Sequence, residues 1–277
     1  MTAVGIEREQ APSAGWTAAT LAVLGDSTTV GLGDPVPGGW RGVGPLLGTA
    51  LGARVHNVAG TGARLADVRR TQLPDALAAR PEAALLIAGM NDTLRSDFDP
   101  VTMRADLTHI VNTLNDAGTV VLLARYHDHA RVFRMPASLR RALRTRIDRL
   151  NQVIDAVVAD TGAPCLDLDT LPGAYEVTTW SVDRLHPSEL GHRLLARGFS
   201  ELLAARGCVV PTPVSLECQG GLNAGPLAHF AWLVIKGIPW LWRRGRDLVP
   251  YAVSIMWRGM PEPAPCGQLE AEPAPRP

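Results

Sequence analysis

Short apolar runs recur along the chain between residues 21 and 168, separated by longer stretches with a different pattern. Five of these runs are mostly apolar and too short to form a helix. They occupy residues 21–24, 54–58, 83–88, 120–124 and 164–168. An apolar run of this length predicts a strand that is buried on both faces of a sheet.

Between these runs, apolar residues recur at the spacing of one face of a helix. The helical stretches cover residues 43–51, 65–77, 101–114, 139–158 and 188–205. The last one begins with Ser188, which follows Pro187 and is a suitable N-cap. Strands that alternate with helices of this length predict βαβ units. We therefore expect an α/β domain over residues 20–206, with helices on both faces of a parallel sheet.

The character of the chain changes after residue 206. Residues 207–225 contain several prolines and glycines, which predicts a linker. Residues 226–260 combine tryptophans and arginines with large apolar side chains, and they predict a helical extension. This extension has three interpretations: packing on the α/β domain, self-association, or peripheral contact with lipid. The proline-rich tail at residues 261–277 is expected to be disordered, and residues 1–19 form an N-terminal extension.

The overall composition is that of a globular protein, with 46% hydrophobic and 19% charged residues. Lys+Arg and Asp+Glu both number 27, so the formal net charge is zero and no nucleic-acid partner is expected. Residues 1–19 lack the basic start and the unbroken apolar core of a secretory signal. The sequence also has no run of about 18 apolar residues, which a spanning helix needs. We therefore expect a cytoplasmic protein.

The sequence carries little sign of a cofactor or a metal. Its four cysteines have no paired C-x-x-C spacing, which argues against a zinc site. A Cys208–Cys218 disulfide depends on the redox compartment and is left open. Gly60-Thr61-Gly62 follows a predicted strand, but Leu65 stands where a dinucleotide-binding loop needs its third glycine. We therefore expect neither a cofactor nor a metal.

His127 and His129 follow the predicted strand at residues 120–124 and so border the carboxyl end of the sheet. With Asp128 they could ligate a metal, but a loop that shapes a pocket at this edge of the sheet is the favoured interpretation. Trp40 and Trp180 are interpreted as packing residues or pocket walls.

Polar residues follow the predicted strands at the point where each strand ends. Ligands of open parallel sheets bind at this edge. Gly25-Asp26-Ser27 follows the first strand, Asn57 to Gly62 the second, and Gly89-Met90-Asn91-Asp92 the third. Asp183-x-x-His186 lies just before the last helix. One rim therefore gathers a serine, a glycine-rich turn, an amide, a carboxylate and an imidazole, which are the groups that acyl transfer requires.

The roles of these side chains follow from their chemistry. The Ser27 hydroxyl is a weak nucleophile and needs a base within hydrogen-bond distance. His186 is the candidate base, and Asp183 would accept a hydrogen bond from its other ring nitrogen. A separation of three residues allows one tight loop to carry both groups. Asp26 is interpreted as a structural residue that holds the turn before the nucleophile.

The four polar blocks resemble those of the SGNH (GDSL-type) hydrolases in their order and spacing, over about residues 20–205. The resemblance implies a flavodoxin-like three-layer α/β/α sandwich with a five-stranded parallel sheet. It also implies an oxyanion hole formed by the backbone N–H groups of Ser27 and Gly62 and by the side-chain amide of Asn91. The motif Gly31-Leu32-Gly33-Asp34 looks most like the corresponding motif of actinobacterial members.

The sequence thus predicts a serine esterase or lipase-type hydrolase that cleaves small-molecule carboxylic esters or thioesters through an acyl-enzyme on Ser27. Carbohydrate deacetylation is a substrate option within this mechanism. The same site would serve an acyltransferase or a product-release enzyme of a biosynthetic pathway, because the acceptor depends on the shape of the pocket. A catalytically inactive binding module is the third alternative, and the intact set of catalytic residues argues against it.

Overall fold

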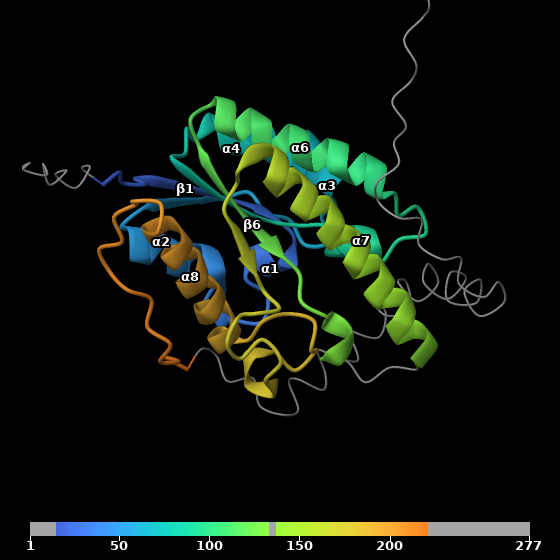
Figure 1. Ribbon diagram of the computed structural model, residues 1–277. Helices are drawn as coiled ribbons and strands as arrows, with labels where there is room; N and C mark the ends of the chain where they lie inside the picture. The colour runs from blue at the N-terminus through green and yellow to red at the C-terminus, as the bar shows by residue number, and fades with distance from the viewer. Residues whose placement is uncertain (1–14, 133–136, 221–277) are drawn as a thin grey trace, which may run out of the picture.

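Five parallel strands form the centre of the molecule (Figure 1). They are β1 (Thr20–Gly25), β4 (Arg54–Asn57), β5 (Ala83–Ile87), β6 (Val120–Arg125) and β7 (Cys165–Asp167), in the spatial order β4-β1-β5-β6-β7. This is the doubly wound order of flavodoxin-like folds, and it confirms the predicted α/β class. The computed structural model describes residues 15–132 and 137–220. The predicted helical extension at 226–260 and tail at 261–277 lie outside the described residues.

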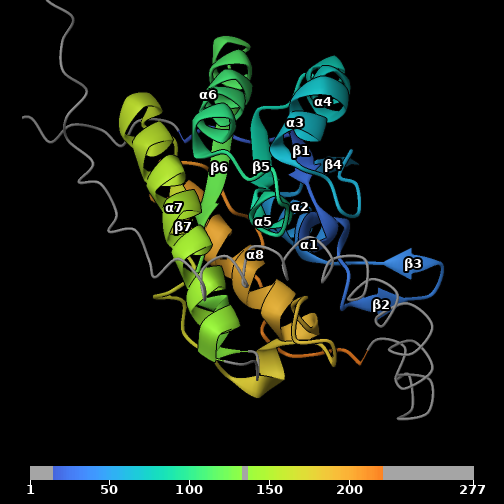
Figure 2. The same cartoon turned by 90° about the vertical axis from the view of Figure 1, so that its right-hand side faces the viewer.

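Helices cover both faces of the sheet and make the predicted three layers (Figure 1 and Figure 2). One face carries α2 (Val43–Leu51) and α8 (Glu189–Ala204), which pack on each other. The other face carries α3 (Leu65–Asp67), the π-helical turn η1 (Val68–Gln72), α4 (Leu73–Ala78), α6 (Pro100–Asp116) and α7 (Ala137–Thr161). Within the described residues, no helix has the length and apolar character needed to cross a membrane.

Four shorter helical segments lie among these elements. They are α1 (Ser27–Val30), α5 (Met90–Thr93), the 3-10 turn η2 (His129–Arg131) and the 3-10 turn η3 (Val177–Thr179). The helices α1 and α5 follow the carboxyl ends of β1 and β5. The strand order reverses between these two strands. Open α/β sheets bind ligands at this edge.

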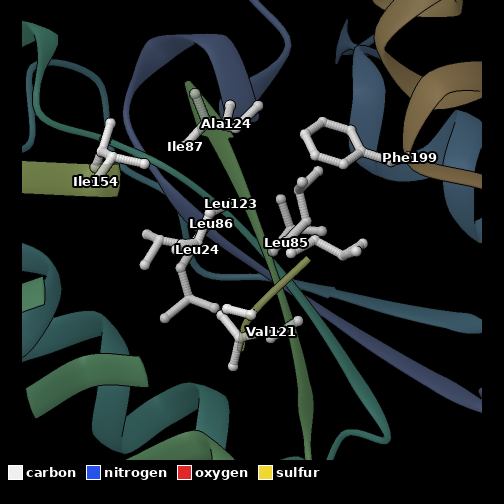
Figure 3. Packing of buried hydrophobic residues seen from close by; sticks show 14 of the residues in the cluster. Leu24, Leu85, Leu86, Ile87, Val121, Leu123, Ala124, Ile154 and Phe199 are labelled. Atoms are coloured by element: carbon white, nitrogen blue, oxygen red, sulfur yellow. The ribbon is translucent and has the colours of Figure 1, made fainter. Parts of the chain in front are cut away.

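Aliphatic side chains from the strands and from both helical layers build the core (Figure 3). Leu85 and Leu86 are consecutive on β5 and therefore point to opposite faces of the sheet. Phe199 of α8 lies on the side of Leu85, and Ile154 of α7 lies on the side of Leu86. All four side chains are buried. Burial on both faces explains why the central strands read as continuous apolar runs.

The edge strand β4 departs from the prediction that every strand is buried on both faces. Arg54, His56 and Asn57 are exposed, and Val55 packs only partly against the core. Among the described residues, β4 pairs only with β1 and so forms an edge of the sheet. The helices pack over the central strands, so side chains at this edge reach solvent. The prediction is therefore wrong for β4.

A small antiparallel hairpin, β2 (Pro35–Val36) and β3 (Gly39–Trp40), projects from the domain between α1 and α2 (Figure 2). The apolar pattern did not predict it, because strands of two residues carry no periodicity. Trp40 is exposed on this hairpin rather than packed in the core.

Residues 207–220 lie against the α/β domain. The Val209 N–H donates to the Trp16 carbonyl oxygen at 2.8 Å, and the Thr212 N–H donates to the Ala50 carbonyl oxygen at 3.2 Å. Cys208 is buried here and Cys218 is exposed, and both are free thiols. The division of the chain into a domain, a linker and an extension stays a prediction, because residues 226–260 are outside the described part.

Candidate active site

The turn after β1 places Ser27 at the first position of helix α1. Gly25 ends the strand with φ +127°, and a Cβ there would lie 2.0 Å from the Ile87 carbonyl oxygen. Only glycine fits this position. The Asp26 side chain then accepts a hydrogen bond from the Thr28 N–H at 2.9 Å and caps the helix, which agrees with the structural role expected for Asp26.

Gln72 supports this turn through two hydrogen bonds to Gly25, a role that the apolar pattern did not predict. Its Oε1 accepts from the Gly25 N–H at 2.7 Å, and its Nε2 donates to the Gly25 carbonyl oxygen at 2.9 Å. The side chain is buried and lies in the π-helical turn η1, a distortion that is frequent at functional sites. A glutamine inside the predicted helix at residues 65–77 was the available signal, since a polar residue in the core needs a polar partner.

The structure brings Ser27, His186 and Asp183 together. Nε2 of His186 lies 2.8 Å from Oγ of Ser27, and Nδ1 of His186 lies 2.7 Å from Oδ2 of Asp183. Ser27 and His186 are separated by 159 residues of sequence. His186 is buried and the other two side chains are half-buried. Both distances are those of good hydrogen bonds, so the three side chains form a continuous hydrogen-bonded chain from carboxylate to hydroxyl.

A tight loop orients the carboxylate and the imidazole. Oδ1 of Asp183 accepts from the backbone N–H groups of Leu185 at 2.8 Å and His186 at 3.0 Å. Arg184 between them has φ +56°, so the loop closes through a left-handed residue. Burial alone would raise the pKa of Asp183, but hydrogen bonds from His186 and Ser181 outweigh it and hold the pKa at about 2. The carboxylate is therefore ionised and favours the proton on Nδ1, which leaves Nε2 free to accept one.

Three candidate hydrogen-bond donors for an oxyanion lie around the turn that carries Ser27. In residues 15–132 and 137–220, the backbone N–H groups of Ser27 and Gly62 donate to no protein acceptor. Gly62 has φ +80°, which suits glycine. Asn91 is buried, and its Nδ2 lies 3.1 Å from the Ala63 carbonyl oxygen and 3.4 Å from Oδ2 of Asp26. The amide is thus held between the glycine-rich turn and the serine turn.

Asp92 connects the two blocks that carry Asn91 and Gly62. Its Oδ2 accepts from the Leu65 N–H at 3.2 Å, and its Oδ1 accepts from Nε of Arg64 at 3.2 Å. Burial raises the pKa of Asp92, while the Leu65 N–H and the Arg64 guanidinium act in the opposite direction. The role of this residue is structural, since it fixes one block against the other.

Asp26 is buried beside the serine turn. Burial raises its pKa from the ordinary value of 3.8 to about 6, although the Thr28 N–H and His186 pull it down. Between pH 3.8 and about pH 6, the Asp26 carboxyl is therefore more protonated in the folded protein than in the unfolded chain. Stability from this group therefore falls as the pH rises through about 6, because the ionised carboxylate is the poorly solvated form.

We expect Asp26→Asn to raise the free energy of unfolding at pH 8 by roughly 2–3 kcal/mol, since one pH unit corresponds to about 1.4 kcal/mol. Asparagine keeps the cap on the Thr28 N–H and gives up the weak 3.4 Å contact between Oδ2 and Nδ2 of Asn91. The gain should disappear near pH 4, where the wild-type carboxyl is also neutral in the folded state. Urea unfolding at both pH values measures it, with Asp116→Asn at the exposed end of α6 as the control. An equal change at pH 4 and pH 8 would contradict this assignment.

An apolar pocket of about 570 Å³, including its space open to solvent, lies beside the catalytic candidates. Its wall includes the residue after the serine, Thr28, and the two residues that flank His186, Leu185 and Pro187. His127 and His129 also line it, which agrees with the interpretation of their loop as part of a pocket. Most of the other lining residues are aliphatic or aromatic.

Trp180 packs against both of these histidines inside the pocket. Its ring centroid lies 4.9 Å from that of His127 and 4.9 Å from that of His129, and the two imidazoles are 4.6 Å apart. Nε1 of Trp180 donates to the Ala174 carbonyl oxygen at 2.9 Å. In the part of the chain that is described, no three His, Cys, Asp or Glu side chains are grouped to hold a metal ion.

Three further histidines among the described residues take no part in the hydrogen bonds that link Asp183, His186 and Ser27. His56 on β4 and His109 on α6 are exposed. His192 on α8 is buried, with Nε2 2.9 Å from the Leu32 carbonyl oxygen.

The sequence profile of the GDSL-like Lipase/Acylhydrolase family matches residues 23–194 of the chain. This range contains all four polar blocks. No protein with a curated description matches the chain in sequence.

Solved structures share the fold. A catalytic variant of Axe2, an acetylxylan esterase from Geobacillus stearothermophilus, has 20% identity and a TM-score of 0.55, covering 69% of this chain and 96% of its own. TesA has 23% identity and a TM-score of 0.54, covering 67% and 98%. The psychrotrophic esterase EstA from Pseudoalteromonas sp. has 18% identity and a TM-score of 0.53, covering 68% and 98%. At such identities the likeness establishes the fold.

Proposed function

Because the chain belongs to the GDSL-like lipase/acylhydrolase (SGNH) family and is a carboxylic ester hydrolase of that family, we propose that it forms an acyl-enzyme on Ser27. The observation that carries this proposal is the pair of hydrogen bonds that links Asp183 to His186 and His186 to Ser27, at 2.7 and 2.8 Å. A nucleophile, a base and an orienting carboxylate in hydrogen-bond contact are the signature of an activated hydroxyl.

In the first half-reaction, Oγ of Ser27 attacks the ester carbonyl carbon while its proton passes to Nε2 of His186. The carbonyl π-bond electrons move to the oxygen, which becomes an oxyanion. When this intermediate collapses, the C–O bond to the alcohol breaks, and the His186 imidazolium gives its proton to the departing oxygen. Asp183 stays ionised throughout and stabilises the imidazolium, in keeping with its low pKa.

In the second half-reaction, water takes the place of the alcohol. Nε2 of His186 removes a proton from the water as its oxygen attacks the acyl carbon. The bond between that carbon and Oγ of Ser27 then breaks, and His186 returns the proton to Oγ. The products are a carboxylic acid and free enzyme, and a thioester would release a thiol by the same steps.

The oxyanion needs preorganised donors in both half-reactions. We assign this role to the backbone N–H groups of Ser27 and Gly62, which are unoccupied by protein acceptors among the described residues. The Asn91 amide is the third donor. It is held near the turn by Ala63 and Asp26, and the 3.4 Å contact with Asp26 is the weaker of the two.

The pocket beside the site indicates the kind of ester. Its wall is mainly aliphatic and aromatic, which favours an ester with an apolar acyl or alcohol group over a strongly polar one. The actinobacterial affinity and the cytoplasmic location stay predictions.

Labelling with a fluorophosphonate tests the mechanism. The wild-type protein should lose its p-nitrophenyl butyrate hydrolysis in parallel with labelling, and peptide mass spectrometry should place one phosphonyl group on Ser27. Heat-denatured protein is the control, because its serine lacks the His186 contact. Absence of both hydrolysis and labelling, or a label on another residue only, would rule out the proposal.

A further inference from the structure

His127 is a buried imidazole in the wall of the apolar pocket. Its exposed fraction is 3%, and Nε2 has no hydrogen-bond partner among the described residues. No hydrogen bond of a described residue reaches Nδ1 either. Buried polar atoms are almost always paired, and an unpaired one costs free energy. An unpaired imidazole in a pocket therefore indicates a group that arrives from outside the protein.

Three aromatic rings contact the imidazole. The rings of His129, Trp180 and Tyr175 have centroids 4.6, 4.9 and 5.7 Å from it. Such contacts fix the plane of the ring but leave the choice of tautomer free. Burial lowers the pKa of His127 to about 4, with a further contribution from Arg131 against an opposing one from Asp169. The ring is therefore neutral at physiological pH, with one nitrogen as donor and the other as acceptor.

A neutral imidazole in an apolar wall suits an uncharged oxygen. A carboxylate or phosphate would prefer a charged partner, and the pocket wall offers leucines instead, at Leu168, Leu171 and Leu194. A carbonyl, ether or hydroxyl oxygen within an aliphatic chain matches both features. It pairs with the imidazole while the rest of the chain contacts the leucines.

We propose that His127 is a specificity-determining residue that selects esters whose aliphatic chain carries an oxygen function away from the scissile bond. This inference rests on the proposed function, because it takes Ser27 to be the nucleophile next to the pocket. The oxygen can belong to the acyl half or to the alcohol half of the ester. Both halves present the same chemistry, so the experiment has one arm for each.

The acyl arm compares p-nitrophenyl esters of straight-chain acids with esters in which a ketone replaces a methylene at successive positions. The alcohol arm compares hexanoates of straight-chain alcohols with those of the matching oxoalcohols. In each arm the readout is the kcat/KM of an oxo ester divided by that of its plain partner. Because this ratio is taken within one protein, it is independent of the amount of active enzyme.

His127→Phe keeps an aromatic ring and removes both nitrogens. In one of the two arms, we expect the ratio in this variant to be about tenfold lower than the ratio in wild type. A tenfold change is the equivalent of one neutral hydrogen bond. His127→Gln, whose amide reaches close to the position of Nε2, should retain most of the preference. His109→Phe on the surface of α6 is the matched control and should leave the ratio unchanged.

A ratio that is the same in wild type and in His127→Phe at every ketone position, in both arms, would overturn the assignment of His127. An equal loss in His127→Gln and His127→Phe would do so too, because it would indicate a packing effect. The proposed function would survive either result if Ser27 is still labelled and the plain esters are still hydrolysed. Failure of wild type to hydrolyse any ester or to be labelled would overturn both proposals.

Discussion

Replacing Ser27 with alanine is expected to lower kcat for p-nitrophenyl butyrate by about 10⁴-fold to 10⁶-fold, because removing the serine of a catalytic triad costs up to about 10⁶-fold in kcat. The variant lacks the Oγ that lies 2.8 Å from Nε2 of His186, so no acyl-enzyme forms. Adding His186→Ala to this variant should cost little more, because the two residues act as one unit. The measurement is steady-state hydrolysis together with fluorophosphonate labelling.

The fold should survive this change. Ser27 occupies the first position of α1, and the cap on that helix comes from Asp26. Ser200→Ala in α8 is a matched control, because its buried hydroxyl bonds only the Arg197 carbonyl oxygen among the described residues. A Ser27→Ala protein that keeps activity within tenfold of wild type, at an unchanged melting temperature, would show that Ser27 is not the nucleophile.

Asp183→Asn is expected to lower kcat by about 10⁴-fold through the tautomer of His186. Oδ1 of Asp183 accepts from two backbone N–H groups and from the Ser181 hydroxyl, so the asparagine carbonyl oxygen should take that position. Its NH₂ group then faces Nδ1 of His186, which must become an acceptor. The imidazole proton moves to Nε2, which can no longer take the proton of Ser27.

This effect is separable from a general loss of structure. The loop keeps its backbone hydrogen bonds to Oδ1, so the melting temperature should change little and the KM should stay within a few-fold of wild type. Asp160→Asn at the surface is the matched control, because its carboxylate pairs with the exposed Arg104. If Asp183→Asn retains more than a tenth of the wild-type kcat, Asp183 does not set the tautomer of His186.

The pattern of apolar residues along the chain was enough to predict the class of fold. Periodicity is a local property, and β1, β5 and β6 are buried on both faces, so their runs are unambiguous. The Ser188 cap before α8 is equally local: its Oγ accepts from the Gly191 N–H at 3.3 Å, and Pro187 precedes it. The four polar blocks were recognisable because each directly follows a strand or precedes a helix.

Other features depend on neighbours that are remote in sequence. The exposure of β4 follows from its place at the edge of the sheet, which its own residues do not specify. Gln72 holds Gly25 across a separation of 47 residues, and only the packing of η1 beneath β1 makes that contact. The pocket likewise combines Thr28, His127 and Trp180, which come from three different parts of the chain.

Residue types along the chain were enough to predict acyl-transfer chemistry, because this reaction requires groups such as a serine, an Asp-x-x-His pair, a glycine turn and an asparagine. The distance of 2.8 Å between Nε2 of His186 and Oγ of Ser27 could not be read from the sequence and arises only in the folded chain. The same is true of the place of His127 in the wall of the adjacent pocket, where its Nε2 has no hydrogen-bond partner among the described residues. Residue type and periodicity are local properties that can be read over a few residues. Distances between side chains on remote segments are set only when the strands have assembled into the sheet.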